Sequence, residues 1–130
     1  MLQYQFDCLC SDVIAHNARV FKNDVAVVCE DRRLTWPELD EATNRFANAL
    51  HGLGLSKGDK VCIFMPNSME TFVAFWGVIK AGCVVVPVNT MLDRESFART
   101  VNSSDAAALF TSAAMRELVE SAREHLVGIP

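Results

Sequence analysis

The chain lacks the features that mark several specialised classes of protein. Its formal net charge is −4 and its longest basic run is Arg32-Arg33, so it has no electrostatic surface suited to nucleic acid. The longest strongly apolar run, residues 84–88, is far too short to cross a bilayer, and we predict no transmembrane segment. No basic segment followed by an apolar stretch opens the sequence, so we expect no secretory signal.

Cysteines are few and irregularly spaced. Their odd number and the lack of a C-x-x-C pair argue against a disulfide scaffold or a zinc knuckle. Cys62 and Cys83 lie inside apolar runs, where a free cysteine behaves as a small hydrophobic residue. Free thiols fit a reducing compartment, and we predict a cytoplasmic protein. The five cysteines are Cys8, Cys10, Cys29, Cys62 and Cys83.

What the chain does have is enough apolar sequence to build a core. Apolar residues make up 51% of its 130 residues, and its mean hydropathy is +0.18, so disorder is not expected. The composition does not shift along the chain, and the length suits one domain. We therefore expect residues 1–130 to form a single α/β domain.

Two kinds of apolar pattern alternate along the chain. The strands are apolar throughout, without alternating polar residues, and amphipathic helices separate them. This order predicts an open, doubly wound and mainly parallel sheet with helices on both faces. The first two strands predict a small N-terminal hairpin, in which Arg32-Arg33 is interpreted as a solvated turn rather than an anion site. Strands are predicted at residues 25–29, 34–35, 61–65, 83–89 and 106–110, and helices at residues 7–21, 35–53 and 68–81 and after residues 93 and 112.

Helix starts carry clear local signals. Residues 35–38 (TWPE) match the T-x-x-E capping box, with proline in the first turn, where its missing N–H costs nothing. The later helices have candidate N-cap residues where they would begin. These residues are Asn67 or Ser68, Asp93 and Ser112.

Helix faces are predicted from the same spacing. The second helix would turn Asp40 and Glu41 toward solvent. The third helix would bury Phe72, Val73, Trp76, Ile79 and Lys80.

The stretch GLGLSKGDK, residues 52–60, invites comparison with a phosphate-binding loop. A dinucleotide fingerprint needs G-x-G-x-x-G after a strand and at the start of a helix, whereas this stretch reads G-x-G-x-x-x-G and follows a helix. The dipole at a helix C-terminus repels anions. We interpret Gly52 or Gly54 as a left-handed helix cap and residues 57–59 as a turn into the next strand.

Three polar pairs are the candidates for a ligand site, because ligands of open α/β sheets bind beyond the carboxyl ends of the strands. They equally suit helix capping, which we favour. None of the histidines has a second ligand at metal spacing, and there is no G-x-S-x-G elbow. No catalytic, cofactor-binding or metal-binding residue is assigned, and the substrate-binding residues are unknown. The pairs are Asn67-Ser68, Asn89-Thr90 and Thr111-Ser112, and the histidines are His16, His51 and His125.

Several segments together resemble the N-terminal region of the adenylate-forming (AMP-binding) enzymes. LTWPEL (residues 34–39) is similar to the motif L-T-[YW]-x-E-L, and KAGCVVVPV (residues 80–88) to K-A-G-x-x-x-V-P-[VI]. The segments between these motifs fit in order and spacing, and the resemblance covers roughly residues 7–127. The sequence NTML (residues 89–92) favours an acyl-CoA synthetase over a peptide-synthetase domain.

This resemblance implies an N-terminal fragment of an ATP-dependent acyl-CoA synthetase, such as a fatty acid–CoA ligase. Such an enzyme converts a carboxylic acid and ATP into an acyl-adenylate and pyrophosphate, then transfers the acyl group to CoA, with Mg²⁺ offsetting phosphate charge. The family's phosphate loop, ribose-binding aspartate and C-terminal lysine have no counterpart in this sequence. No family residue is therefore carried over, and the fragment is expected to be inactive and to bind none of ATP, Mg²⁺ and CoA.

Other interpretations remain open at this point. The chain could be a stand-alone α/β module that binds a ligand or a protein, or a fragment of another adenylate-forming enzyme. A truncated sheet exposes apolar surface and unpaired strand edges, so we also predict self-association.

Overall fold

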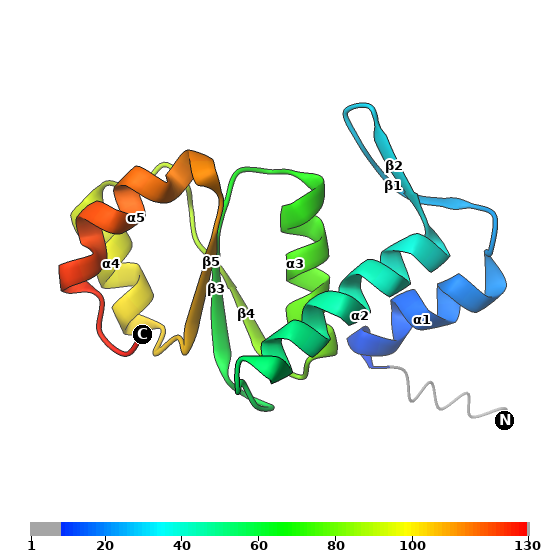
Figure 1. Cartoon of the computed structure of the whole chain (residues 1–130), viewed down its shortest axis with the longest axis horizontal. Helices are drawn as coiled ribbons and strands as arrows, with labels where there is room; N and C mark the ends of the chain where they lie inside the picture. The colour runs from blue at the N-terminus through cyan, green and yellow to red at the C-terminus, as the bar shows by residue number, and fades with distance from the viewer. Residues whose placement is uncertain (1–8, 130) are drawn as a thin grey trace, which may run out of the picture.

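Three parallel strands form the centre of the structure, in the order β4-β3-β5. The computed structural model describes residues 9–129, and Figure 1 shows α2 and α3 on one face of the sheet and α4 and α5 on the other. This confirms the predicted doubly wound parallel sheet. The strands are β3 (Lys60–Phe64), β4 (Val84–Pro87) and β5 (Ala108–Thr111), and the helices are α2 (Trp36–Gly52), α3 (Met69–Lys80), α4 (Arg94–Ser103) and α5 (Arg116–Ala122).

The elements that precede α2 in the chain lie beyond α2, away from the sheet (Figure 1). Helix α1 (Cys10–Val20) contacts α2, and β1 (Val25–Cys29) pairs with β2 (Arg32–Thr35) in the predicted antiparallel hairpin. The predicted start of the first helix, Asp7, lies outside the described residues, as does Cys8. Two short 3₁₀ turns flank α5, η1 (Ala113–Met115) before it and η2 (Arg123–His125) after it.

The central strand β3 supplies side chains to two separate cores. Val61 and Ile63 point into a core with α2 and α3, here called the α2/α3 core, and Cys62 and Phe64 into a core with α4 and α5, the α4/α5 core. All four are at most 3% exposed, which explains why the strand is apolar without alternation. Burying each such large side chain contributes about 1.5–3 kcal/mol, so β3 is central to the stability of both layers.

Helix α2 begins at the predicted capping box. The Thr35 hydroxyl accepts a hydrogen bond from the N–H of Glu38 at 3.5 Å, and the Thr35 N–H donates to the Glu38 carboxylate at 2.8 Å. The latter bond is the main cause that lowers the pKa of Glu38. Ser68 and Asp93 likewise cap α3 and α4, as predicted, by accepting from the N–H groups of Thr71 and Ser96.

The glycine-rich stretch connects α2 to β3, as its position in the sequence predicted. Gly54 and Gly58 have φ angles of 87° and 90°, the left-handed region that favours glycine. The Asp59 carboxylate accepts from the N–H of Ser56 at 2.6 Å, and the N–H of Gly58 donates to the carbonyl of Gly82 at 2.9 Å. This stretch is therefore a pair of turns that also fixes the start of β4.

The prediction that Asp40 lies on a solvated face is wrong. Lys80 of α3 pairs with the Asp40 carboxylate and donates to Asn44 at 2.9 Å, and the Lys80 side chain is only 7% exposed. The partners stand on two helices, so spacing within α2 could not reveal them. Glu41, which pairs with Arg45, is exposed as predicted.

The arginine pair also differs from the prediction. Arg32 and Arg33 belong to β2, and Arg32 forms a salt bridge with Glu70 in the first turn of α3. This hydrogen-bonded pair lowers the pKa of Glu70 and raises that of Arg32. The contact ties the hairpin to α3, and both side chains remain about 61% exposed.

Two further predictions, on the buried side of α3 and on the cap at Ser112, are wrong. The most buried residues of α3 are Met69, Ala74, Gly77 and Val78, none of which was predicted to be buried, and Phe72 is 37% exposed. Of the predicted residues, Lys80 does have a buried side chain. The spacing does not define a face because α3 is apolar on nearly all sides. Ser112 caps no α-helix, because the 3₁₀ turn η1 follows it and its side chain makes no capping hydrogen bond.

Candidate functional site

The carboxyl ends of β3 and β4 border a cleft of about 350 Å³, here called the carboxyl-edge cleft. Two of the three predicted polar pairs contribute to it, because parallel strands end at the same edge of a sheet. Its walls combine apolar side chains with a few polar groups. The lining residues are Ile63, Met65, Pro66, Asn67, Thr71, Phe75, Pro87, Val88, Asn89 and Thr90.

Several polar side chains at this edge already serve the backbone. The Thr71 hydroxyl donates to the carbonyl of Pro66 at 2.6 Å, which holds the chain between β3 and α3. Asn89 accepts from the N–H of Met91 at 2.9 Å and thereby stabilises the turn after β4. The favoured capping role therefore holds for Ser68, whereas Asn89 stabilises a turn and caps no helix, because Asp93 caps α4. The side chains of Asn67 and Thr90 make no hydrogen bond to another described residue and can contact a ligand.

The third predicted pair lies elsewhere. Thr111 donates to the carbonyl of Phe64 at 3.0 Å and lines a different cleft, of about 160 Å³, beside α5. The Ser112 hydroxyl oxygen is buried and has no hydrogen-bond partner among the described residues. The structure thus brings Asn67, Asn89 and Thr90 together and leaves Thr111 and Ser112 apart from them.

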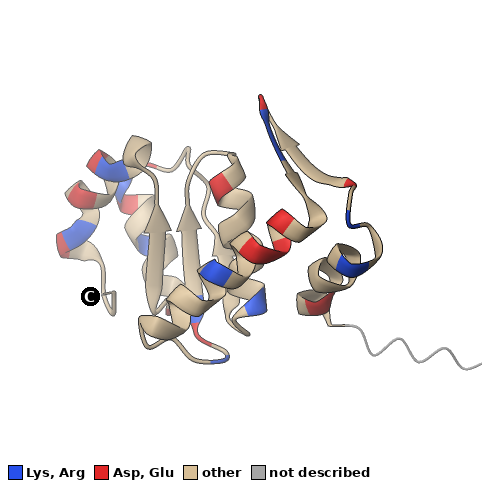
Figure 2. Ribbon diagram, turned by 45° about the vertical axis from the view of Figure 1, so that its right-hand side comes forward, with Lys and Arg blue, Asp and Glu red and all other residues tan. Residues whose placement is uncertain are grey.

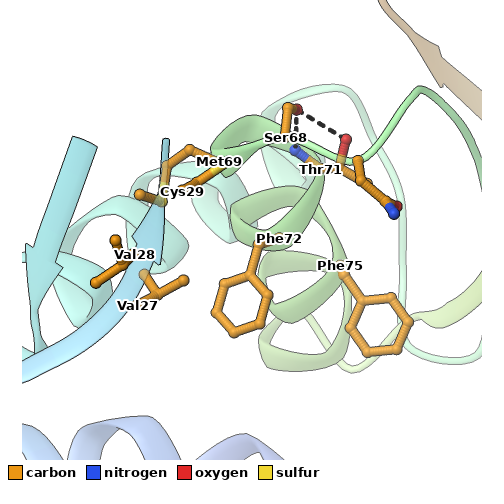
Figure 3. A pocket seen from close by; sticks show the side chains of 9 residues that line it. Val27, Val28, Cys29, Ser68, Met69, Thr71, Phe72 and Phe75 are labelled. Atoms are coloured by element: carbon orange, nitrogen blue, oxygen red, sulfur yellow. Dashed lines mark hydrogen bonds between the residues drawn. The ribbon is translucent and has the colours of Figure 1, made fainter. Parts of the chain in front are cut away.

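A second hollow, the hairpin groove, runs between β1 and the start of α3 (Figure 3). Its volume is about 300 Å³, and it shares Asn67, Thr71 and Phe75 with the carboxyl-edge cleft. The sequence analysis did not anticipate Thr71 or Phe75. Their spacing of four residues on one helix places them on the same face, a signal that could have paired them. The groove is otherwise lined by Val27, Val28, Cys29, Ser68, Met69 and Phe72.

Both hollows are lined by uncharged side chains. Amide and hydroxyl groups beside aromatic and aliphatic walls suit a small, uncharged or apolar ligand. Across residues 9–129, no three His, Cys, Asp or Glu side chains are grouped so that they could hold a metal ion. His16, His51 and His125 lie on α1, α2 and η2, so the structure does not bring them together.

The thiols of the two core cysteines are poor nucleophiles. Burial raises the pKa of Cys62, and the Ser104 hydroxyl, 3.5 Å from its Sγ atom, opposes this only in part. Burial also raises the pKa of Cys83, and the nearby Asp59 adds to the effect. A thiol reacts as the thiolate, so both residues are structural, as their apolar sequence context predicted.

No helix within residues 9–129 is both long enough and apolar enough to cross a membrane.

The fold and the ordered motifs define one part of an α/β enzyme scaffold. The AMP-binding enzyme family matches residues 14–128, and the chain belongs to this family. That range agrees with the resemblance found in the sequence.

Relatives and solved structures point the same way. The chain is 37% identical over 101 residues to a crotonobetaine/carnitine–CoA ligase of Escherichia fergusonii, a match that covers 74% of this chain and 20% of the relative. It also matches the anthranilate CoA ligase AuaEII in complex with anthranoyl-AMP, with a TM-score of 0.88 and 28% identity over 94% of this chain and 24% of that one. The chain thus spans about a fifth of the length of the curated relatives it matches.

One matched structure is itself a part of a longer enzyme. The N-terminal domain of FACL13 from Mycobacterium tuberculosis, solved with an inhibitor, has a TM-score of 0.84 and 30% identity over 88% of this chain and 29% of that chain. The predicted family and fold are therefore confirmed, and the relatives are CoA ligases.

Proposed function

We propose that this chain is the N-terminal part of an ATP-dependent acyl-CoA ligase. The observation that supports the proposal most strongly is the family match across residues 14–128, together with relatives that are CoA ligases. In this proposal residues 1–130 are one α/β unit that supports the catalytic apparatus of a longer enzyme.

The proposed reaction of the longer enzyme has two steps. A carboxylate oxygen attacks the α-phosphorus of ATP, forming an acyl-adenylate and releasing pyrophosphate. The thiol sulfur of CoA then attacks the acyl carbon, the bond to phosphate breaks, and AMP leaves. Activation is needed because a carboxylate is a poor electrophile, whereas the mixed anhydride has a good leaving group.

The described residues do not fit ATP, CoA or Mg²⁺ by themselves. The glycine-rich stretch follows the C-terminus of α2, where carbonyl groups and the helix dipole repel phosphate. No acidic cluster suited to a metal ion occurs within residues 9–129. We therefore assign to residues 9–129 a scaffolding role, and propose that the chain alone is inactive. The free, buried thiols of Cys62 and Cys83 favour a reducing, cytoplasmic location for the enzyme.

A pyrophosphate-release assay tests the proposal directly. The purified chain is mixed with ATP, Mg²⁺, CoA and a panel of aliphatic and aromatic carboxylates, and we expect no release above the protein-free background. A full-length CoA ligase relative serves as the positive control. Turnover by the 130-residue chain would contradict the proposed scaffolding role.

The substrate class has a separate test. A longer polypeptide that contains this chain should form acyl-CoA from a carboxylate. An aminoacyl-adenylate as its product, without thioester formation on CoA, would instead assign the chain to another adenylate-forming enzyme.

A further inference from the structure

Helix α3 carries charged residues only in its first and last turns (Figure 2). Glu70 in the first turn pairs with Arg32 of β2, and Lys80 in the last turn pairs with Asp40 of α2. The side chains of Arg32 and Glu70 are about 61% exposed, whereas that of Lys80 is 7% exposed. Water and salt screen the exposed pair, whereas the buried ammonium group depends on its partners in the protein.

The Lys80 ammonium group has as many acceptors as it has N–H groups. It donates to the Asp40 carboxylate, to the carbonyl oxygen of Asp40 at 3.4 Å and to the side-chain oxygen of Asn44 at 2.9 Å. The amide nitrogen of Asn44 in turn donates to the Asp40 carboxylate at 3.3 Å. The three side chains therefore form a closed set of hydrogen bonds around the buried charge, here called the Lys80 network.

The side chains that α2 and α3 share in the α2/α3 core are apolar. Ala47 and Leu50 of α2 belong to this core together with Ala74 and Val78 of α3. Apolar burial is not directional, and α3 is apolar on nearly all sides, so this packing discriminates weakly between neighbouring axial positions of α2. A directional contact is needed to select one position.

A shift of α2 along α3 would disrupt the Lys80 network. Residues four apart lie on one face of a helix, so a shift by one turn in one direction brings Asn44 and Asn48 to the places of Asp40 and Asn44. The buried ammonium group then has no carboxylate. A shift in the other direction brings Trp36 to the place of Asp40, where an indole replaces an oxygen acceptor. Burying a charge without a full set of partners is unfavourable, so both shifted positions are disfavoured.

The position of α2 also sets the position of the hairpin. Strand β2 ends at Thr35 and α2 begins at Trp36, so the hairpin is directly attached to the start of α2. The N–H of Trp36 donates to the carbonyl of Asp24 at 3.2 Å, which ties the start of β1 to the same helix. The opposite wall of the hairpin groove consists of α3 residues, among them Thr71 and Phe75. The width of the groove therefore depends on where α2 lies along α3.

The Lys80 network also joins the two sequence motifs of the chain. Asp40 directly follows LTWPEL (residues 34–39), and Lys80 is the first residue of KAGCVVVPV (residues 80–88). We propose that Lys80 is a positioning residue, whose network with Asp40 and Asn44 selects one axial position of α2 on α3 and thereby sets the width of the hairpin groove. The inference concerns contacts within the described fold and does not rest on the proposed ligase function.

NMR of the unmodified protein tests the network directly. The ammonium protons of Lys80 are expected to exchange slowly enough with water to be observed and to show Overhauser effects to Asn44, whereas those of the exposed Lys57 exchange too fast. Overhauser effects between the Phe46 ring and the α-protons of Gly77 report the axial position, because a Cβ atom built at Gly77 would lie 2.6 Å from Cδ1 of Phe46. Lys80 ammonium protons that exchange as fast as those of Lys57 would overturn the proposal.

An apolar replacement of the whole network separates positioning from stability. The triple variant Lys80→Met, Asp40→Leu, Asn44→Leu leaves no buried charge unpaired, so we expect it to fold with a stability similar to that of the unmodified protein. The Overhauser effects that report the axial position should lose intensity, and the amide peaks of Val27 and Thr71, on the two walls of the groove, should broaden or double. A triple variant that keeps those effects at full intensity, with single sharp peaks, would contradict the positioning role.

Single substitutions supply the matched control. Lys80→Met alone leaves the Asp40 carboxylate without its cation and is expected to lower the folding equilibrium constant by at least about tenfold. Glu70→Gln removes the exposed ion pair at the other end of α3, and should lower this constant by less than about fivefold without changing the axial position. Equal effects of the two substitutions count against the proposal. If the triple variant does not fold, the ammonium exchange of the unmodified protein and this comparison still decide between the outcomes.

Discussion

Only a hydrogen atom fits as the side chain of residue 77. A Cβ atom built there would lie 2.6 Å from Cδ1 and 2.8 Å from Cβ of Phe46, which belongs to α2. The Phe46 ring in turn packs against Phe110 of β5, with centroids 4.9 Å apart. Gly77 therefore permits the close approach of α2 and α3 on one face of the sheet.

Gly77→Ala is expected to destabilise the protein by about 1–3 kcal/mol, because Phe46 must move from its packed position. The matched control is Gly52→Ala, since a Cβ at Gly52 would meet nothing within 4 Å. This control should be neutral or stabilising by less than about 1 kcal/mol. Urea unfolding followed by tryptophan fluorescence measures both, and equal effects of the two substitutions would contradict the packing argument.

At the scale of residues, the sequence predicted the burial of the two core cysteines but not which residue Asp40 would contact. Cys62 and Cys83 were expected in the core from the apolar residues around them, and they are there. The contact between Lys80 and Asp40 joins residues 40 positions apart, so no local pattern could reveal it. Packing between helices, rather than periodicity along one helix, decided where Asp40 lies.

At the scale of elements, the N-terminal cap of α4 makes the stability of the protein depend on pH. The Asp93 carboxylate accepts from the N–H of Ser96 at 2.9 Å, and this bond is the main cause that lowers the pKa of Asp93. A carboxyl group with a lowered pKa in the folded state stabilises the protein above its unfolded pKa. That stabilisation is lost as the pH falls through the folded pKa.

We therefore expect Asp93→Ala to destabilise the protein at neutral pH and to differ less from the unmodified protein below pH about 4, near the ordinary pKa of Asp. Urea unfolding at neutral and acidic pH gives the two differences. Asp93→Asn keeps an acceptor for Ser96 without the charge, and should be milder than Asp93→Ala at neutral pH. A stability gap for Asp93→Ala that is the same at both pH values would argue against a charged cap.

Local chemistry explains which elements could be predicted. Thr35, Ser68 and Asp93 form caps from residues three positions apart, so the signal lies within a few residues of sequence. Ser112 has the same residue type, yet the chain after β5 first makes a 3₁₀ turn, and the cap is not formed. The order of the strands in the sheet could not be predicted, because it depends on pairing between segments far apart in the chain.

One part of the candidate site could be predicted from the sequence and another part could not. The carboxyl-edge rule follows from strand direction alone and named three polar pairs, of which Asn67, Asn89 and Thr90 line one cleft, whereas Thr111 and Ser112 do not. The hairpin groove needs Val27 of β1 and Phe72 of α3 side by side, as Figure 3 shows. No local signal reports a contact between residues so far apart in the sequence.

At the scale of the whole molecule, the two cores are expected to unfold together. Strand β3 contributes Val61 and Ile63 to the α2/α3 core and Cys62 and Phe64 to the α4/α5 core. Loss of either helix layer exposes the β3 side chains that faced it and weakens the strand on which the other layer packs. The sheet therefore makes the two layers one cooperative unit.

Thiol labelling in urea tests this cooperativity. Cys83 belongs to the α2/α3 core and Cys62 to the α4/α5 core, and burial raises the pKa of both. We expect mass spectrometry to show the two labelling at the same urea midpoint, while the exposed Cys10 labels without urea. Labelling of Cys83 at clearly lower urea than Cys62 would mean that the layers unfold separately.

Pro87 also sets a limit on how large an assembly of this chain can grow. A fibre built by adding strand to strand needs two open edges per molecule, one to receive and one to offer. Pro87 faces outward on β4 and offers no N–H donor, so a further strand could not complete a regular ladder at that edge. Stacking of molecules strand upon strand is therefore blocked at the β4 edge of the sheet.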